Sequence, residues 1–241
     1  MTDVGSAGLI HAEPEIATRP SVRLRRQLAL TIGPFAAACT ALVEHPRVAE
    51  LWPEYLIVQH QIIRATVPLT EVAADRARAL TGADPVAPEL AAYLDGHVDE
   101  ERGHDDDLLA DLESLGIDRE AVLARMPSPS VASLVGCQYY WILHHHPIAF
   151  LGFVALMEGF PPTTELIETL KARTQHPAGA FRTFAQHGDL DPDHRDHLDR
   201  TLDSMPLTRE HEVVMGISAT TSAALAAPVL EELLEQRPLR A

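Results

Sequence analysis

Hydrophobic residues recur at the three- to four-residue spacing of amphipathic helices along nearly the whole chain from Ser21 onward. Alternating, strand-like patterns and Asn-Gly or Asp-Gly hairpin signals are almost absent. Helices are predicted over 21–43 with a kink at Pro34, 47–66 with an interruption near Pro53, 70–80 with Thr70 as N-cap, 88–115, 130–146, 147–158, 163–174, 179–187, 192–205 and 210–234. We therefore expect an all-α, up-and-down helical bundle of roughly seven to ten helices.

Domain organisation follows from the same pattern. Residues 1–20 are polar, contain Pro14 and Pro20, and are predicted to form a flexible arm. Neither an internal repeat nor a linker divides the rest of the sequence, so residues 21–241 are expected to form a single domain.

Composition and charge argue against some classes of binding partner. The 241 residues carry 19 Lys and Arg against 35 Asp and Glu, a formal net charge of -16, which disfavours nucleic acid and anionic membranes. There is no secretory signal pattern and no uncharged apolar run of the ~18–20 residues that a bilayer span needs, so we expect a soluble, cytoplasmic protein. Two cysteines cannot form a zinc ribbon or a disulfide framework. A small-molecule substrate is expected, and a homodimer is left open.

Histidines and carboxylates are the candidate chemistry, because the chain holds 13 histidines. His187, Asp191 and His194 are spaced i, i+4 and i+7, which places them on one face of a helix. Iron and manganese sites in helical bundles are built from such faces. The structural alternative is that Asp191 is an N-cap, with Pro192 at the first helical position.

A second group lies in the predicted helix 88–115. Glu101 and His104 form the Glu-x-x-His pair of di-iron carboxylate bundles, and His97 lies one turn earlier on the same face. A solvated acidic helix face is the structural alternative. Gly103 costs about 1 kcal/mol relative to alanine inside a helix, which suggests that another group packs closely there.

The third element is Glu158, which follows a run of apolar and small residues beginning at Phe150. A carboxylate on such a helix is costly unless it is paired or bound to a cation. Alternatively, Glu158 emerges into solvent at the helix end, beside Gly159 and Pro161. Together the three segments supply three carboxylates and three histidines, a set suited to two Fe(II) ions with positions open for O₂. Gly-rich nucleotide loops and the Gly-x-Ser-x-Gly elbow are absent from the sequence.

The ordered pattern Glu101-x2-His104, then Glu158, then His187-x3-Asp191-x2-His194 resembles the haem-oxygenase-like di-iron oxidases and oxygenases. The resemblance covers about residues 40–235 and includes the helix end Leu112 to Gly116. The wider superfamily also contains thiaminase-like and pyrroloquinoline-quinone-synthase-like proteins. It implies a haem-oxygenase-like bundle that holds two irons, often loosely, and activates O₂ to oxidise small molecules. Known reactions are N-oxygenation, desaturation and oxidative C–C cleavage of amino or fatty acids.

The resemblance also implies the metal ligands, which are Glu101, His104, Glu158, His187, Asp191 and His194. Glu158 or Glu101 would bridge the irons. His97 or Glu100 is an alternative to Glu101, and Glu54 or Glu50 an additional carboxylate. Pro192 would interrupt the helix that this register requires. We expect the substrate to be an amino acid or an aliphatic carboxylate.

Other residues are open to two interpretations. The aromatic segment with Tyr139, Tyr140, Trp141, Phe150 and Phe153 is either the wall of a dry pocket or bundle core. His144, His145 and His146 are interpreted as capping and surface residues. His60 is either a core or a pocket residue, and Arg64 could pair with a substrate carboxylate or within the bundle.

Two other functions stay open at this point. The first is a metal-free, thiaminase-like or quinone-synthase-like enzyme of the same fold, for which Cys137, beside Tyr139 and Tyr140, is the candidate nucleophile. The second is a non-catalytic helical binding protein, in which the six proposed ligands would lie on unrelated faces.

Overall fold

The computed structural model describes residues 19–235, without the side chains of residues 191 and 192. Within this part every regular element is helical, which confirms the predicted all-α class. The elements are α1 (Pro20–Thr31), α2 (Gly33–Glu44), α3 (Val48–Ile63), α4 (Thr66–Ala79), α5 (Ala87–Glu101), α6 (His104–Glu113), α7 (Arg119–Leu123), α8 (Pro129–His144), η2 (Pro147–Ala149), α9 (Phe150–Met157), α10 (Thr164–Thr174), η3 (Ala178–Phe181), α11 (Arg182–Ser204) and α12 (Arg209–Glu235). Most of the predicted arm, residues 1–18, lies outside the described residues.

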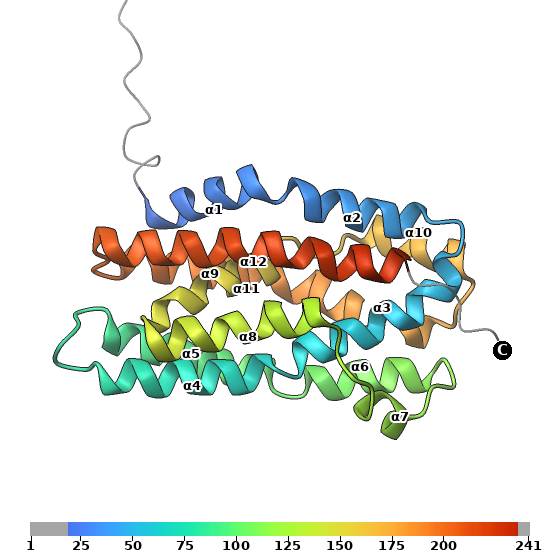
Figure 1. Ribbon diagram of the computed structural model, residues 1–241, viewed down its shortest axis with the longest axis horizontal. Helices are drawn as coiled ribbons and strands as arrows, with labels where there is room; N and C mark the ends of the chain where they lie inside the picture. Colours follow the sequence, from blue (N-terminus) through green and yellow to red (C-terminus); the bar gives the residue numbers. More distant parts are fainter. Residues whose placement is uncertain (1–18, 236–241) are drawn as a thin grey trace, which may run out of the picture.

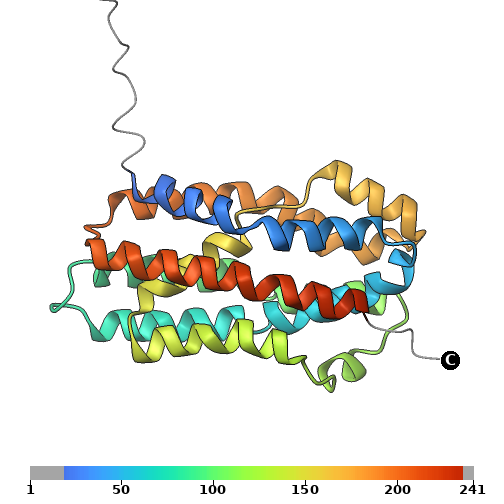
Figure 2. The ribbon, with the colours of Figure 1, turned by 45° about the horizontal axis from the view of Figure 1, so that its top comes forward.

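The helices run roughly antiparallel along one long axis (Figures 1 and 2). Helix α12 extends along most of this axis, and α1 and α2 follow one another along its side. Helix α4 packs against α5, and α9 packs against α12 in the interior. The bundle thus surrounds a short central helix, α9, whose last turn leads to Glu158.

Two apolar clusters hold this arrangement together. The larger one is centred on α9, where Phe150, Leu151 and Ala155 are fully buried. The second is centred on Trp52 of α3, which stacks on Phe181 with ring centroids 5.0 Å apart. Burial of a large apolar side chain contributes about 1.5–3 kcal/mol, so these clusters supply the main driving force for folding.

Proline does not interrupt α3, contrary to the prediction. Pro53 lies inside the continuous helix Val48–Ile63. Its missing N–H leaves the carbonyl of Ala49 without an intrahelical donor. His176 Nε2 fills this role at 2.7 Å from the Ala49 oxygen. A distant side chain therefore satisfies the group that the proline leaves unpaired.

Other boundaries also differ from the predictions. Helix α4 begins at Thr66, so Thr70 is an interior residue whose Oγ1 donates to the Thr66 carbonyl, and not an N-cap. The predicted kink at Pro34 is a break at Ile32, where α1 and α2 meet at 59°. The helix end falls before Pro34 because proline has no N–H with which to continue the hydrogen-bond ladder.

Helix α12 is long and apolar enough to span a membrane by length and composition, and so is the bent pair formed by α1 and α2. However, 61% of the apolar window of α12 is buried inside the bundle. Burial of this kind is typical of the core helix of a soluble protein. A cytoplasmic location stays a prediction.

Candidate metal centre

Glu101 and His104 lie on two helices, and not on one long helix as predicted. Glu101 is the last residue of α5 and His104 the first of α6. Between them, Gly103 adopts a left-handed conformation with φ 97°, which residues with a side chain rarely adopt. A Cβ atom at Gly103 would meet no other atom within 4 Å, so conformation and not close packing explains this glycine.

Glu158 is positioned by the packing of α9. A Cβ atom on Gly152 would lie 2.3 Å from the Met215 carbonyl oxygen, so only glycine lets α9 approach α12 this closely. Arg25 of α1 donates from Nη1 to the Ala155 carbonyl at 2.9 Å and pairs with Asp199 of α11 at 2.9 Å. These contacts hold the last turn of α9, and Glu158 follows as its C-cap residue, only 6% exposed.

His187 and His194 share one continuous helix, α11 (Arg182–Ser204). The predicted break between residues 187 and 192 is therefore wrong, and position 191 lies inside a helix, which excludes the N-cap interpretation. The side chain of Asp191 lies outside the described residues. Near the start of α11, the buried Asp111 accepts from the Thr183 N–H at 2.9 Å, which fixes this helix against α6.

Four of the six predicted ligands come together, and His97 joins them. His97, Glu101 and Glu158 are all buried, and one potential donor atom of each lies within 4.8 Å of the others. His104 Nδ1 lies 3.3 Å from Glu101 Oε2. The His104 and His187 rings are 4.8 Å apart between centroids, which brings α11 to the same place. The sequence alone does not settle whether His97 adds to the ligands or replaces Glu101, because its distance from Glu158 is a tertiary feature.

The electrostatics of the cluster favour positive charge. Burial alone would lower the pKa of His97, but the three glutamates around it outweigh burial and raise that pKa. Burial alone would raise the pKa of Glu101, but the neighbouring histidines outweigh it and lower that pKa. The buried carboxylates therefore stabilise a cation at this place.

The residues present fit a divalent metal. The donors are carboxylate oxygens and imidazole nitrogens, the ligand types of non-haem iron. His97 Nδ1 lies 3.5 Å from Glu158 Oε1 and 3.6 Å from Glu100 Oε2. Charge-assisted hydrogen bonds are shorter, about 2.7–2.9 Å. His97 Nδ1 and Glu158 Oε1, which belong to two buried side chains, are therefore far enough apart to share an ion between them.

The remaining acidic candidates divide into two groups. Glu100 faces α11, where its Oε1 lies 3.7 Å from His197 Nδ1, and the pKa of Glu100 is lowered by His97 first and also by His194. The charge of His194 therefore acts on Glu100, the chain neighbour of Glu101. Glu54 pairs with Arg125, and Glu50 contacts Arg47 at 3.5 Å; neither is among the described residues that line the adjoining cavity.

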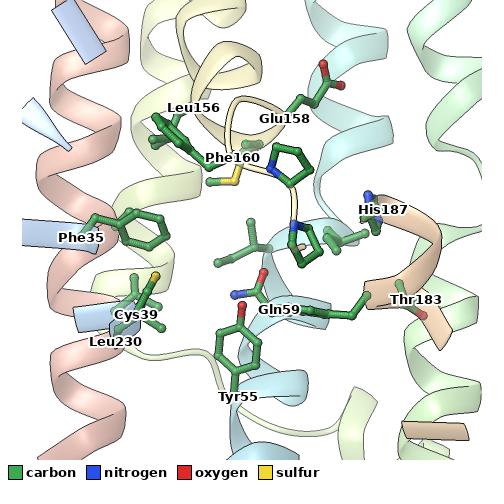
Figure 3. A pocket seen from close by; sticks show the side chains of 18 of the residues that line it. Phe35, Cys39, Tyr55, Gln59, Leu156, Glu158, Phe160, Thr183, His187 and Leu230 are labelled. Carbon is green, nitrogen blue, oxygen red and sulfur yellow. The ribbon is translucent and has the colours of Figure 1, made fainter. Parts of the chain in front are cut away.

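A cavity of about 440 Å³ adjoins the cluster, and its walls are mainly apolar (Figure 3). His97, Glu101, Glu158 and His187 lie on its wall. The aromatic residues that line it are Phe35, Trp52, Tyr55, Phe153, Phe160 and Phe184. Of the predicted aromatic wall, only Phe153 takes part, and Phe150 is core. Among the described residues, neither lysine nor arginine lines the cavity, so Arg64 is not placed to bind a substrate carboxylate there.

The two cysteines and His60, His144, His145 and His146 are not part of the cluster. Cys137 is not among the described lining residues, and burial raises its pKa. Cys39 does line the cavity, and burial raises the pKa of its thiol to about 11. His144 and His145 are exposed at the end of α8, while His146 caps η2, in agreement with the interpretation as capping and surface residues. His60 is fully buried core.

A second cluster joins three segments at another place in the bundle. Asp84 Oδ2 lies 3.1 Å from Nε2 of both His146 and His211. The Nδ1 atoms of these histidines accept backbone N–H groups, from Ile148 and Thr208 respectively. Each Nε2 therefore carries the proton and donates a hydrogen bond to Asp84. This arrangement is a hydrogen-bonded clamp, because metal-binding nitrogens must be free of protons.

A comparison with known protein families points to the same kind of site as the buried cluster of histidines and glutamates. The family model described as "iron-containing redox enzyme" matches residues 71–225. No curated protein sequence matches the chain significantly. A domain of unknown function with a haem-oxygenase-like fold from Shewanella denitrificans is similar in structure, with a TM-score of 0.69, 18% identity and 93% of each chain covered.

Two TenA homologues are also similar. The protein from Pseudomonas syringae has a TM-score of 0.66 and 13% identity, and the match covers 96% of this chain and 100% of the other. The protein from P. horikoshii has a TM-score of 0.58 and 15% identity, with 90% and 99% covered. At these identities the likeness shows the fold, and it confirms the predicted haem-oxygenase-like bundle.

Proposed function

Because this chain belongs to the family of iron-containing redox enzymes, we propose that it is a non-haem di-iron oxidase or oxygenase that uses O₂. The observation that carries this proposal is the buried convergence of His97, Glu101 and Glu158 beside His104 and His187, on the wall of a cavity. The proposed ligands are Glu101, His104, Glu158, His187, Asp191 and His194, with His97 as an additional donor.

Two ferrous ions bound here would supply two of the four electrons needed to reduce O₂ fully, and the substrate that is oxidised would supply the other two. The protein contributes a rigid frame and a dry environment. Glu101 and Glu158 are 8% and 6% exposed, so their charges are poorly screened and attract cations strongly. The apolar cavity walls exclude water from the place where the substrate would be oxidised.

The cavity also bears on the proposed substrate. Apolar walls without a lysine or arginine among the described residues favour an aliphatic molecule over a free amino acid, whose two charges would need partners. We therefore favour oxidation of an aliphatic substrate, by desaturation, oxygen insertion or C–C cleavage.

Anaerobic loading with Fe(II), followed by metal analysis and exposure to O₂, tests this function. We expect up to two irons per chain and a transient charge-transfer absorption after mixing with O₂. Glu158→Ala should lose most of the bound iron. Glu54→Ala is the matched control and should retain it, because Glu54 pairs with Arg125 away from the cavity. Fewer than one iron per chain without an absorption change would refute the proposal.

A metal-free enzyme with a cysteine nucleophile has less support. Cys137 lies off the cavity, and the raised pKa of Cys39 keeps its thiol protonated at neutral pH.

A further inference from the structure

Two polar side chains of α3 interrupt the apolar lining of the cavity. Tyr55 and Gln59 are one helical turn apart and both line the cavity. Figure 3 shows the Tyr55 hydroxyl directed toward the Gln59 amide, on the side of the cavity away from Glu158. Within the described part of the chain, neither side chain makes a hydrogen bond. Polar groups withdrawn from bulk water normally have a hydrogen-bond partner, so the half-buried Tyr55 and Gln59 are available to a ligand.

The tyrosine is held in place before any ligand arrives. Its ring stacks on Trp52, with centroids 5.3 Å apart, and meets the edge of Phe184 at 5.7 Å. Burial raises the pKa of Tyr55 well above its ordinary value, so the hydroxyl stays protonated and can donate. A donor fixed in advance loses little entropy when it binds a ligand.

The chemistry of the pair selects an uncharged group. A phenol hydroxyl and a carboxamide each donate and accept hydrogen bonds but carry no charge. A carboxylate placed here would face no cation, because neither lysine nor arginine lines the cavity among the described residues. We propose that Tyr55 and Gln59 form a subsite for a neutral hydrogen-bonding group, such as an amide, alcohol or carbonyl, on an otherwise aliphatic substrate.

This inference rests on the proposed function only in assigning the cavity to the substrate, and its test does not need iron. Trp52 lines the cavity against Tyr55, so its fluorescence should report ligand entry. Metal-free protein would be titrated with octanamide, 1-octanol, octanoate and 1-octene. We expect octanamide and 1-octanol to bind more tightly than octanoate and 1-octene.

The variants Tyr55→Phe and Gln59→Leu separate the subsite from general hydrophobic binding. Each should weaken octanamide binding by roughly three- to tenfold, the effect of losing one neutral hydrogen bond, and leave 1-octene binding unchanged. Thermal unfolding checks that each variant folds. If only one of the two variants folds, that variant is sufficient to test the subsite. Unchanged octanamide affinity in both folded variants, or octanoate as the tightest ligand, overturns the proposal. If octanamide binds as expected but iron does not, the di-iron function fails while the subsite stands.

Discussion

The close approach of α9 to α12 can be tested with a single methyl group. In Gly152→Ala the new Cβ would lie 2.3 Å from the Met215 carbonyl oxygen and 2.7 Å from the Ala219 nitrogen. Both atoms belong to the backbone of α12, so no side-chain rotation can relieve the contact. The two helices must move apart, and overpacking of this kind costs about 1–3 kcal/mol, occasionally more.

The same substitution elsewhere provides the matched control. Alanine is favoured over glycine inside a helix by about 1 kcal/mol. A Cβ atom on Gly136, in the middle of α8, meets nothing within 4 Å. Gly136→Ala should therefore stabilise the protein by up to about 1 kcal/mol. For Gly152→Ala the two backbone contacts put the steric cost at the upper end of its range, about 3 kcal/mol. Subtracting the helix-propensity gain of about 1 kcal/mol leaves a net destabilisation of about 2 kcal/mol.

Urea unfolding followed by far-UV circular dichroism measures both changes, and thermal unfolding provides a second measure. A loss of about 2 kcal/mol corresponds to a melting temperature lower by roughly 4–8 °C for a chain of this size. Because α9 presents Glu158, iron retention should fall in Gly152→Ala and not in Gly136→Ala. If Gly152→Ala is as stable as Gly136→Ala, the two helices are not in contact as described, and the reasoning on the position of Glu158 is refuted.

Three further predictions concern the half-buried residues Asp84, His146 and Cys39. Asp84→Asn should lower the free energy of unfolding by about 2 kcal/mol in urea titrations, because the carboxylate of Asp84 accepts hydrogen bonds from two histidines and a backbone N–H. An unchanged free energy of unfolding would show that these hydrogen bonds are not formed. Burial first, and then the charge of His211, lowers the pKa of His146 from its ordinary value of 6.5. The contribution of His146 to stability is therefore complete above pH 6.5 and is lost as the pH falls toward the lower pKa of the folded state. The decrease in the free energy of unfolding between about pH 7.5 and pH 5 should be smaller in His146→Gln than in the wild type. Burial raises the pKa of the Cys39 thiol from 9.0 to about 11. Cys39 should therefore react with iodoacetamide on the order of 100-fold more slowly at neutral pH than a model thiol, as measured by mass spectrometry. Rapid alkylation of Cys39 in the folded protein would contradict this prediction.

The general architecture could be predicted from hydrophobic spacing, because it requires only that each helix bury one face. The ends of α10 were located almost to the residue, since Thr163 is an N-cap whose hydroxyl accepts from the Leu166 N–H. The position of Glu158 at the end of an apolar helix was likewise visible in the sequence.

The errors arose where a local rule was overridden by distant contacts. Pro53 was expected to break a helix, but His176 binds the carbonyl that proline leaves unpaired. Gly103 was interpreted as a packing glycine, but its left-handed conformation separates two helices. His97 could not be ranked above its neighbours, because what distinguishes it is its distance from a residue 61 positions later. No local pattern contains that information.

The placement of the proposed ligands at helix ends has a consequence for how ions would enter and leave. Glu101 closes α5, His104 opens α6 and Glu158 caps α9. Backbone groups at helix termini lack part of the intrahelical ladder, and terminal turns open at far lower cost than helix interiors. Exchange of a bound ion would then involve the terminal turns of α5 and α6, while the last turn of α9, held by Arg25, and the apolar layers around Phe150 and Trp52 stay closed. A fold built in this way would release and recover a bound ion without unfolding.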